Sequence, residues 1–143
     1  MGKHDLTCFE TSGCGPLGLL TLAVAKAYGV KKIVMFDIVE SRAKFAESYG
    51  ADVGIHSPEP PTKSSLDFAR EYAKEIIMKH GEEGSTGFDV AVEASGAEIC
   101  AQTAVCILKS GGTCTWKPPK NKKEKEKKKK EKSPWGSEQS LED

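Results

Sequence analysis

The sequence predicts an α/β fold with a parallel, doubly wound sheet and a disordered, lysine-rich C-terminal tail. Strand-like and helix-like segments alternate along residues 13–116, the order that produces right-handed strand–helix–strand crossovers. A length of 143 residues is enough for about one hydrophobic core. We therefore expect one α/β unit and no room for a second, catalytic domain.

The first predicted elements follow a glycine-rich turn. Residues 17–30 are apolar almost throughout, which is typical of a helix buried against a sheet, and Gly29 is placed to end it. Residues 32–37 form a continuous β-favouring run, as expected for a parallel strand covered on both faces. A short helix over 40–49 and a short strand over 51–56 follow.

The second half of the predicted unit begins after a proline turn at 58–61. Thr62 and Ser64 are candidate N-caps for a helix that ends at His80-Gly81. Its apolar positions follow the three-and-four spacing of one helix face. The remaining predicted elements are a strand over 87–93, a helix over 97–108 and the start of a fifth strand over 112–116.

The charge distribution separates the end of the chain from the rest. Residues 1–116 carry 11 basic and 15 acidic side chains, whereas residues 117–143 carry 10 and 6. Lys120–Lys132 is too polar to build a core. Such a run could bind nucleic acid or act as a nuclear address, but no aromatic or fold motif for nucleic acid accompanies it. We favour a solvated, disordered tail over residues 117–143 and expect no nucleic-acid partner.

The cysteines and the apolar runs indicate a cytoplasmic protein with no membrane partner. The five cysteines form no Cys-x-x-Cys pair, their number is odd, and no signal-peptide pattern precedes them. We therefore expect reduced thiols. The longest apolar run, 17–30, contains Lys26 and is shorter than the roughly 20 residues that span a bilayer.

The most informative motif is Gly13-Cys14-Gly15-Pro16-Leu17-Gly18, a G-x-G-x-x-G directly before an apolar helix. The first glycine of such a motif permits a tight strand-to-helix turn, the second lets backbone approach a pyrophosphate, and the third allows close helix packing. The N-terminus of the following helix presents free N–H groups to the diphosphate. A glycine turn alone is weak evidence, but here the helix, the next strand and the strand–helix–strand spacing agree.

An acidic residue completes the pattern. Asp37 follows the last glycine by 19 residues and lies at the end of the predicted second strand. A carboxylate at this place accepts hydrogen bonds from the adenosine ribose and repels a 2′-phosphate. The sequence therefore predicts NAD as cofactor, rather than NADP, in an incomplete Rossmann-type domain.

Several linked segments resemble the zinc-dependent, medium-chain alcohol and polyol dehydrogenases, nearest to the sorbitol, xylitol and arabinitol dehydrogenases. The resemblance covers about residues 13–115, and its most specific feature is the proline inside the glycine motif. The other matching segments are Ala25-Lys26-Ala27-Tyr28-Gly29, Asp37-Ile38-Val39-Glu40-Ser41-Arg42, Tyr49-Gly50-Ala51-Asp52, Phe88-Asp89-Val90-Ala91-Val92-Glu93-Ala94-Ser95-Gly96-Ala97-Glu98 and Gly111-Gly112-Thr113.

This resemblance implies roles for individual residues. Leu17 would pack beside the cofactor, Arg42 would lie against the adenine end, and Ser95 and Gly96 would line the cleft. An equally simple alternative to this role is that Arg42 is an exposed, solvated charge on a helix surface. The complete set of candidate cofactor-binding residues is Gly13, Gly15, Pro16, Leu17, Gly18, Asp37, Arg42, Ser95 and Gly96.

The sequence also departs from this family before Gly13. Catalytic zinc in the family is held by an N-terminal domain and needs three protein ligands, for which His4 and Cys8 are too few. We therefore predict no metal ligand and no catalytic residue. Glu10 occupies the expected first strand, and its burial there costs several kcal/mol unless it is paired or neutralised. We accordingly expect residues 1–12 to be irregular.

The resemblance stops after Trp116, where the relatives continue into a loop that contacts the nicotinamide. A shortened gene product would explain both ends.

Two functions are compatible with these sequence features. The first is the NAD-binding part of a polyol dehydrogenase-like oxidoreductase, whose complete relatives use zinc and transfer a hydride between NAD and a secondary alcohol. The alternative is a non-catalytic NAD-binding or interaction module.

Overall fold

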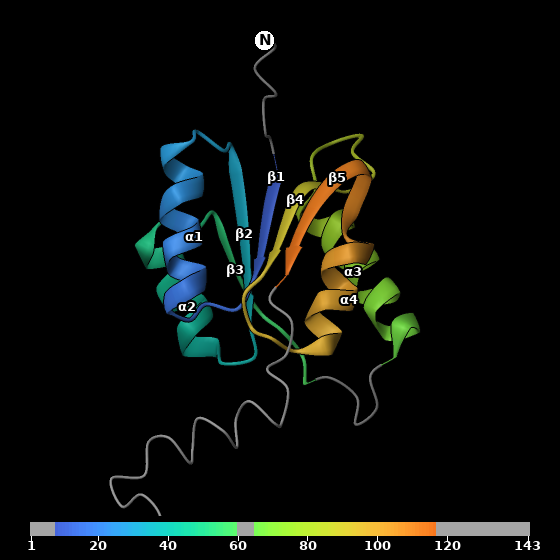
Figure 1. Cartoon of the computed structure of the whole chain (residues 1–143), viewed down its shortest axis with the longest axis horizontal. Coiled ribbons are helices and arrows are strands. Elements are labelled where there is room, and N and C mark those ends of the chain that lie inside the picture. The colour runs from blue at the N-terminus through green and yellow to red at the C-terminus, as the bar shows by residue number, and fades with distance from the viewer. Residues whose placement is uncertain (1–7, 60–64, 117–143) are drawn as a thin grey trace, which may run out of the picture.

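The computed structural model describes residues 8–59 and 65–116 (Figure 1). Strands and helices alternate along the whole of this part of the chain, which confirms the predicted α/β class. The elements are β1 (Cys8–Ser12), α1 (Pro16–Ala27), β2 (Lys32–Asp37), α2 (Glu40–Tyr49), β3 (Val53–His56), α3 (Leu66–His80), β4 (Phe88–Glu93), α4 (Glu98–Cys106) and β5 (Leu108–Trp116).

The five strands form one parallel sheet in the order β3-β2-β1-β4-β5. The chain moves outward from β1 to β3 and then crosses back to β4. Helices α1 and α2 cover one face, and α3 and α4 cover the other (Figure 1). This is the predicted Rossmann-like, doubly wound arrangement. In such sheets ligands bind at the carboxyl ends of the strands where the order reverses, which here is the space between β1 and β4.

The prediction that residues 1–12 are irregular is wrong for Cys8–Ser12, which form the central strand. All residues of β1 are buried, because β2 and β4 pair with it on both sides. Glu10 has no exposed surface, and its burial, with the nearby Glu93 carboxyl, raises its pKa to about 8. The side chain is therefore neutral at pH 7, one of the two conditions under which such burial is tolerable.

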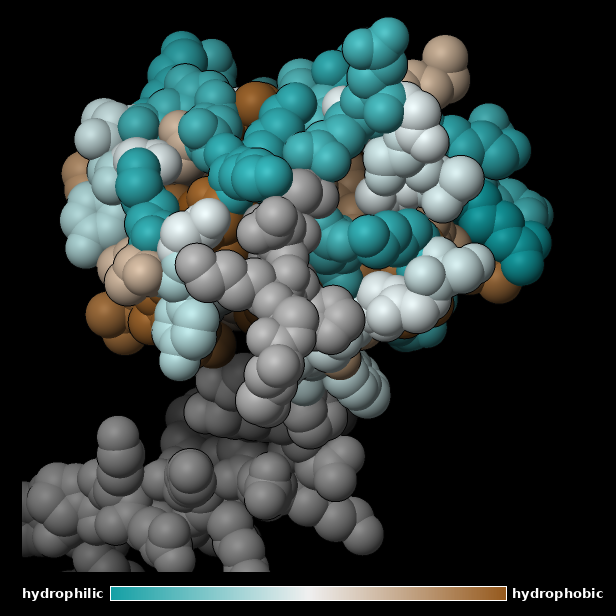
Figure 2. Space-filling view, turned by 90° about the horizontal axis from the view of Figure 1, so that it is seen from above, coloured by the Kyte–Doolittle hydropathy of each residue, from teal (hydrophilic) through white to brown (hydrophobic). Residues whose placement is uncertain are grey.

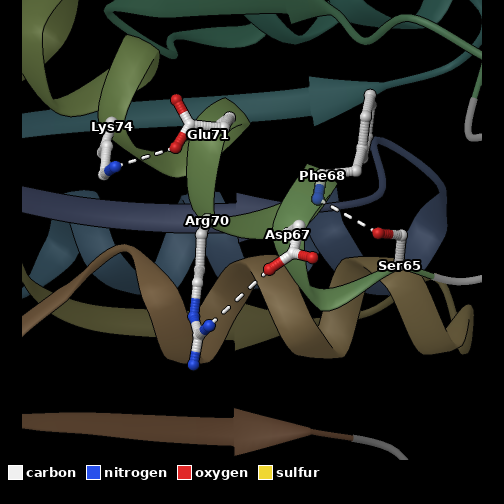
Figure 3. Close-up of polar contacts among 6 residues, drawn as sticks. All are labelled: Ser65, Asp67, Phe68, Arg70, Glu71 and Lys74. Atoms are coloured by element: carbon white, nitrogen blue, oxygen red, sulfur yellow. Dashed lines mark hydrogen bonds and ion pairs between the residues drawn. The ribbon is translucent and has the colours of Figure 1, made fainter.

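Helix α3 begins later than predicted, because its N-cap is one residue beyond Ser64 and three beyond Thr62, the two candidates. Ser65 is the N-cap, and its Oγ accepts a hydrogen bond from the N–H of Phe68 at 3.4 Å (Figure 3). Thr62 and Ser64 lie outside the described residues. Exposed ion pairs join Asp67 to Arg70 and Glu71 to Lys74 on the same helix (Figure 3).

Helix α1 is less buried than its composition predicts. Leu22 and Ala25 face the sheet, whereas Leu20, Val24 and Tyr28 are exposed. The reason is that α1 packs on the sheet with one side, and no described element covers its other side. Figure 2 looks onto the amino ends of the strands and shows mostly hydrophilic side chains there, with hydrophobic ones toward α1. Among the described residues, none of the helices combines the length and apolarity needed to cross a bilayer.

Candidate functional site

A cleft lies at the carboxyl ends of β1, β2 and β4, where the sheet order reverses. It is lined by five of the predicted residues: Gly13, Gly15, Asp37, Arg42 and Ser95. Gly13 and Gly15 come from the β1–α1 turn, Asp37 and Arg42 from the end of β2 and the start of α2, and Ser95 from the β4–α4 turn. The doubly wound topology therefore assembles the predicted site.

The glycine turn owes its shape to two close approaches. Gly13 has a φ of 101°, and a Cβ atom placed on it would lie 3.1 Å from the backbone nitrogen of Ser95. A Cβ atom on Gly18 would lie 1.8 Å from the carbonyl oxygen of Gly13. These glycines are needed by the protein itself, because a side chain at either place would displace backbone.

Gly15 differs from the other two glycines because it faces open space. A Cβ atom on it would have no neighbour within 4 Å, so the fold alone does not require glycine here. Gly15 is the N-cap of α1, no side chain caps this helix, and its first turn contains no acidic residue. Since the first turn of an α-helix has N–H groups without intrahelical acceptors, this end of α1 can accept an anion.

Asp37 joins two of the connections that form the cleft. Its Oδ2 accepts a hydrogen bond from the N–H of Cys14 at 2.9 Å, and its Oδ1 accepts one from the N–H of Val39 at 2.8 Å. Burial, together with the Asp37 carboxylate, raises the pKa of the Cys14 thiol to about 12. Each carboxylate oxygen keeps a second lone pair for a ligand hydroxyl.

The β4–α4 turn forms the opposite wall of the cleft. The Oε1 atom of Glu93 accepts hydrogen bonds from the N–H groups of Ser95 and Gly96 at 2.6 and 2.7 Å, and another from the Ser95 hydroxyl. Gly96 has a φ of 77°, which permits the tight turn. Ser95 borders the cleft, and Gly96 shapes the turn behind it.

Known proteins are similar to this chain over most of the residues that form the described sheet and helices. The family described as zinc-binding dehydrogenase matches residues 16–116. The chain belongs to this family. D-xylulose reductase A of Aspergillus niger is 42% identical over 101 residues, which are 71% of this chain and 26% of that protein. The chain thus spans about a quarter of the length of the curated relatives that it matches.

Solved structures of dehydrogenases share the fold. The zinc-dependent alcohol dehydrogenase 2 of Streptococcus pneumonia is 28% identical, with a TM-score of 0.59, over 87% of this chain and 34% of that one. The 2R,3R-butanediol dehydrogenase of Bacillus subtilis is 26% identical, with a TM-score of 0.59, over 80% of this chain and 30% of that one. The described part of this zinc-binding dehydrogenase family member therefore shares its fold with about a third of each of these dehydrogenases.

Four predicted residues of this family member lie beside the cleft and not among its lining residues. Pro16 begins α1, Gly18 supports the turn, and Gly96 shapes the β4–α4 connection. Leu17 is half-exposed and borders an apolar groove along α1 with Phe9 and Val92. Its predicted contact with the cofactor stays a prediction.

An apolar recess, which was not predicted from the sequence, continues from the cleft toward α3. Ile38, Ser57 and Cys100 border both spaces, and the recess also contains Pro58 and the stacked rings of Phe68 and Tyr72. Ile38 and Ser57 directly follow β2 and β3. The rule that ligands bind beyond the carboxyl ends of parallel strands could have identified them.

The described residues contain no group of three or more His, Cys, Asp or Glu side chains that could hold a metal ion. Cys8, one of the two residues considered as a zinc ligand, is buried in β1, and burial raises its pKa to about 11. A thiol must lose its proton to bind zinc, so the surroundings of Cys8 disfavour that role. His4 lies outside the described part of the chain.

Proposed function

We propose that the cleft binds NAD and that this chain supplies the cofactor-binding part of an oxidoreductase that transfers a hydride between NAD and a secondary alcohol of a polyol. One observation carries the proposal. The glycine turn, the uncapped end of α1 and the Asp37 carboxylate converge at the place where the sheet order reverses.

The residues present fit the diphosphate and the ribose. The open space beside Gly15 admits the pyrophosphate to the N–H groups of α1. The free lone pairs of the Asp37 carboxylate can accept hydrogen bonds from the hydroxyls of the adenosine ribose, and the negative charge of Asp37 disfavours a 2′-phosphate. This arrangement supports NAD over NADP.

The apolar recess fits the adenine ring. Ile38 and Ser57 border both the recess and the cleft that Asp37 lines, so a base attached to the bound ribose would reach them. Arg42 is exposed in the first turn of α2 and borders the same cleft. Its guanidinium group would close the adenine end, while Ser95 lines the opposite wall and Gly96 shapes the turn behind it.

Bound NAD would supply the hydride acceptor at its nicotinamide ring. The residues of the cleft bind and orient the adenosine half of the cofactor, and no step of catalysis is assigned to them. Zinc would be held by a separate domain in complete relatives, where it acts as a Lewis acid on the alcohol. The similarity to a D-xylulose reductase supports a polyol as the substrate class.

Cytoplasmic location remains part of the proposal. All five cysteines are free in the structure, which agrees with a reducing compartment. The lysine-rich tail lies outside the described residues and is given no role in the cleft.

Calorimetric titration of the full chain with NAD tests the proposal directly. We expect saturable binding of NAD that is stronger than that of NADP. Absence of NAD binding by the folded protein would overturn it. Zinc analysis and an assay with NAD plus xylitol, sorbitol or arabinitol separate the two functions. Turnover with stoichiometric zinc indicates an enzyme. NAD binding with neither zinc nor turnover indicates a non-catalytic NAD-binding module.

A further inference from the structure

Two carboxyl groups lie buried on the same face of the central sheet. Glu10 of β1 is completely buried, and Glu93 of β4 is 2% exposed. Ser12 pairs with Glu93 across the two strands, so Glu10 lies two residues earlier on the same face. Each carboxyl group has an Oε2 atom without a hydrogen-bond partner among the described residues. The charge of Glu93 adds to burial in raising the pKa of Glu10, because a buried carboxylate disfavours a second negative charge nearby.

Their partners show which of the two is the anion. Glu93 uses Oε1 as an acceptor for the two N–H groups and the hydroxyl of the β4–α4 turn, as expected of a carboxylate. In the described part of the chain, Glu10 accepts a hydrogen bond only from the Ser12 hydroxyl, at 2.6 Å. The proton shared by the pair therefore belongs on Glu10.

Within residues 8–59 and 65–116, the titratable groups found around the pair carry no positive charge. Cys8 of β1, Tyr72 of α3, Cys100 of α4 and Cys114 of β5 interact with these carboxyl groups or lie on their side of the sheet. Burial raises the pKa of each of these four groups. They therefore stay neutral while Glu10 titrates, and the charge of the pair depends on Glu10.

The β4–α4 turn connects this pair to the cleft. Ser95 borders the cleft, and Gly13 of the glycine turn approaches its backbone nitrogen closely. A shift of Ser95 would thus move both walls of the site. Glu93 never lines the cleft, but its Oε1 holds the N–H groups that determine where Ser95 lies.

We propose that Glu93 is a positioning residue for the cofactor cleft and that it holds the β4–α4 turn only while Glu10 keeps the single proton of the pair. The effect on NAD rests on the proposed function; the effect on the turn does not. When Glu10 ionises, repulsion between the two carboxylates displaces the Glu93 carboxylate from its present position and so disturbs its hydrogen bonds to Ser95 and Gly96. Burial and Glu93 raise the pKa of Glu10 to about 8, so the change falls in the mildly alkaline range.

The turn is tested by NMR on the full chain without ligand. We expect the amide signals of Ser95 and Gly96 to shift with one titration centred near pH 8, and to stay unchanged over the same range in Glu10→Gln, whose neutral side chain imitates the protonated acid. Amide signals that do not titrate in the unmutated protein, or that titrate equally in Glu10→Gln, would overturn the proposal.

The consequence for the cleft is tested by NAD titrations between pH 6.5 and 9.5. We expect affinity to fall by up to about tenfold per pH unit above pH 8, the dependence of a single required proton, and Glu10→Gln to bind equally well throughout. Glu71→Gln, an exposed change on α3, is the matched control and should follow the unmutated protein. Binding that is independent of pH refutes the link to the cleft. If NAD never binds but the two amides titrate as expected, the proposed function fails and the control of the turn by Glu93 stands.

Discussion

The carboxylate of Asp37 binds the N–H of Cys14 through Oδ2, at 2.9 Å, and so holds the end of β2 to the glycine turn after β1. Its other oxygen holds Val39 at the start of α2. Asp37 therefore has a structural role beside its proposed contact with the ribose. The two roles separate only in part, because Asn keeps the shape of the side chain and one acceptor oxygen, whereas Ala removes both acceptors.

NAD should bind more tightly than NADP. Asp37→Asn should narrow this difference in affinity, because it removes the charge that repels the 2′-phosphate of NADP. Asp37→Ala should narrow this difference in affinity as well. It should also lower the free energy of unfolding by about 1–3 kcal/mol, since two N–H groups lose their acceptor, and Asp37→Asn should lower it less, since only one of them does. Calorimetry with both cofactors and urea denaturation measure these effects. Equal affinity of the unmutated protein for NAD and NADP would exclude the assignment of Asp37 to the ribose.

Gly15→Val should abolish NAD binding and leave the fold almost unchanged. A side chain at this place enters open space within the cleft, so it meets the pyrophosphate and not the protein. A less favourable N-cap should cost about 1 kcal/mol or less. Calorimetry and circular dichroism are the measurements, and Ala23→Val on the exposed side of α1 is the control for a β-branched residue. Normal NAD binding by Gly15→Val would mean that the motif is only a turn.

Gly18→Ala should destabilise the protein, against the expectation from helix propensity. In a helix interior Ala is more favourable than Gly by roughly 0.5–1 kcal/mol. Here the added Cβ would collide with the carbonyl oxygen of Gly13, and overpacking typically costs about 1–3 kcal/mol. Urea denaturation decides the sign. A more stable variant would show that the turn can move away from α1.

The buried Glu10 should make stability fall as pH rises. Its pKa of about 8 in the folded chain lies above the ordinary value of 4.5, so between these values the unfolded chain has lost a proton that the folded chain keeps. The free energy of unfolding then decreases by about 1.4 kcal/mol per pH unit from this group and levels off above pH 8. Glu10→Gln should lack this contribution.

Urea denaturation of both proteins at several pH values from 5 to 9 isolates the contribution of Glu10, because all other titrating groups are shared. Glu71→Gln again serves as the exposed control. A constant difference in the free energy of unfolding between Glu10→Gln and the unmutated protein across this range would show that Glu10 does not keep its proton in the folded chain.

Local sequence was sufficient for the elements and for the central motif. The β-favouring run at 32–37 and the helix at 40–49 have the predicted bounds, since their patterns depend only on neighbouring residues. The spacing from Gly13 to Asp37 indicated a shared site, because a strand–helix–strand unit always brings these two ends together. Family membership followed from the same short segments.

Other features depend on which strands become neighbours. Glu10 argued against a strand on local grounds. Pairing with β2 and β4 on both sides nevertheless makes Cys8–Ser12 the central strand. Burial in this strand, with the charge of Glu93, raises the pKa of Glu10, so the neutral acid is tolerated there. The apolar recess likewise depends on segments brought together by the crossover from β3 to β4. Burial and charge interactions of this kind depend on distances in space, which a pattern of neighbouring residues does not contain.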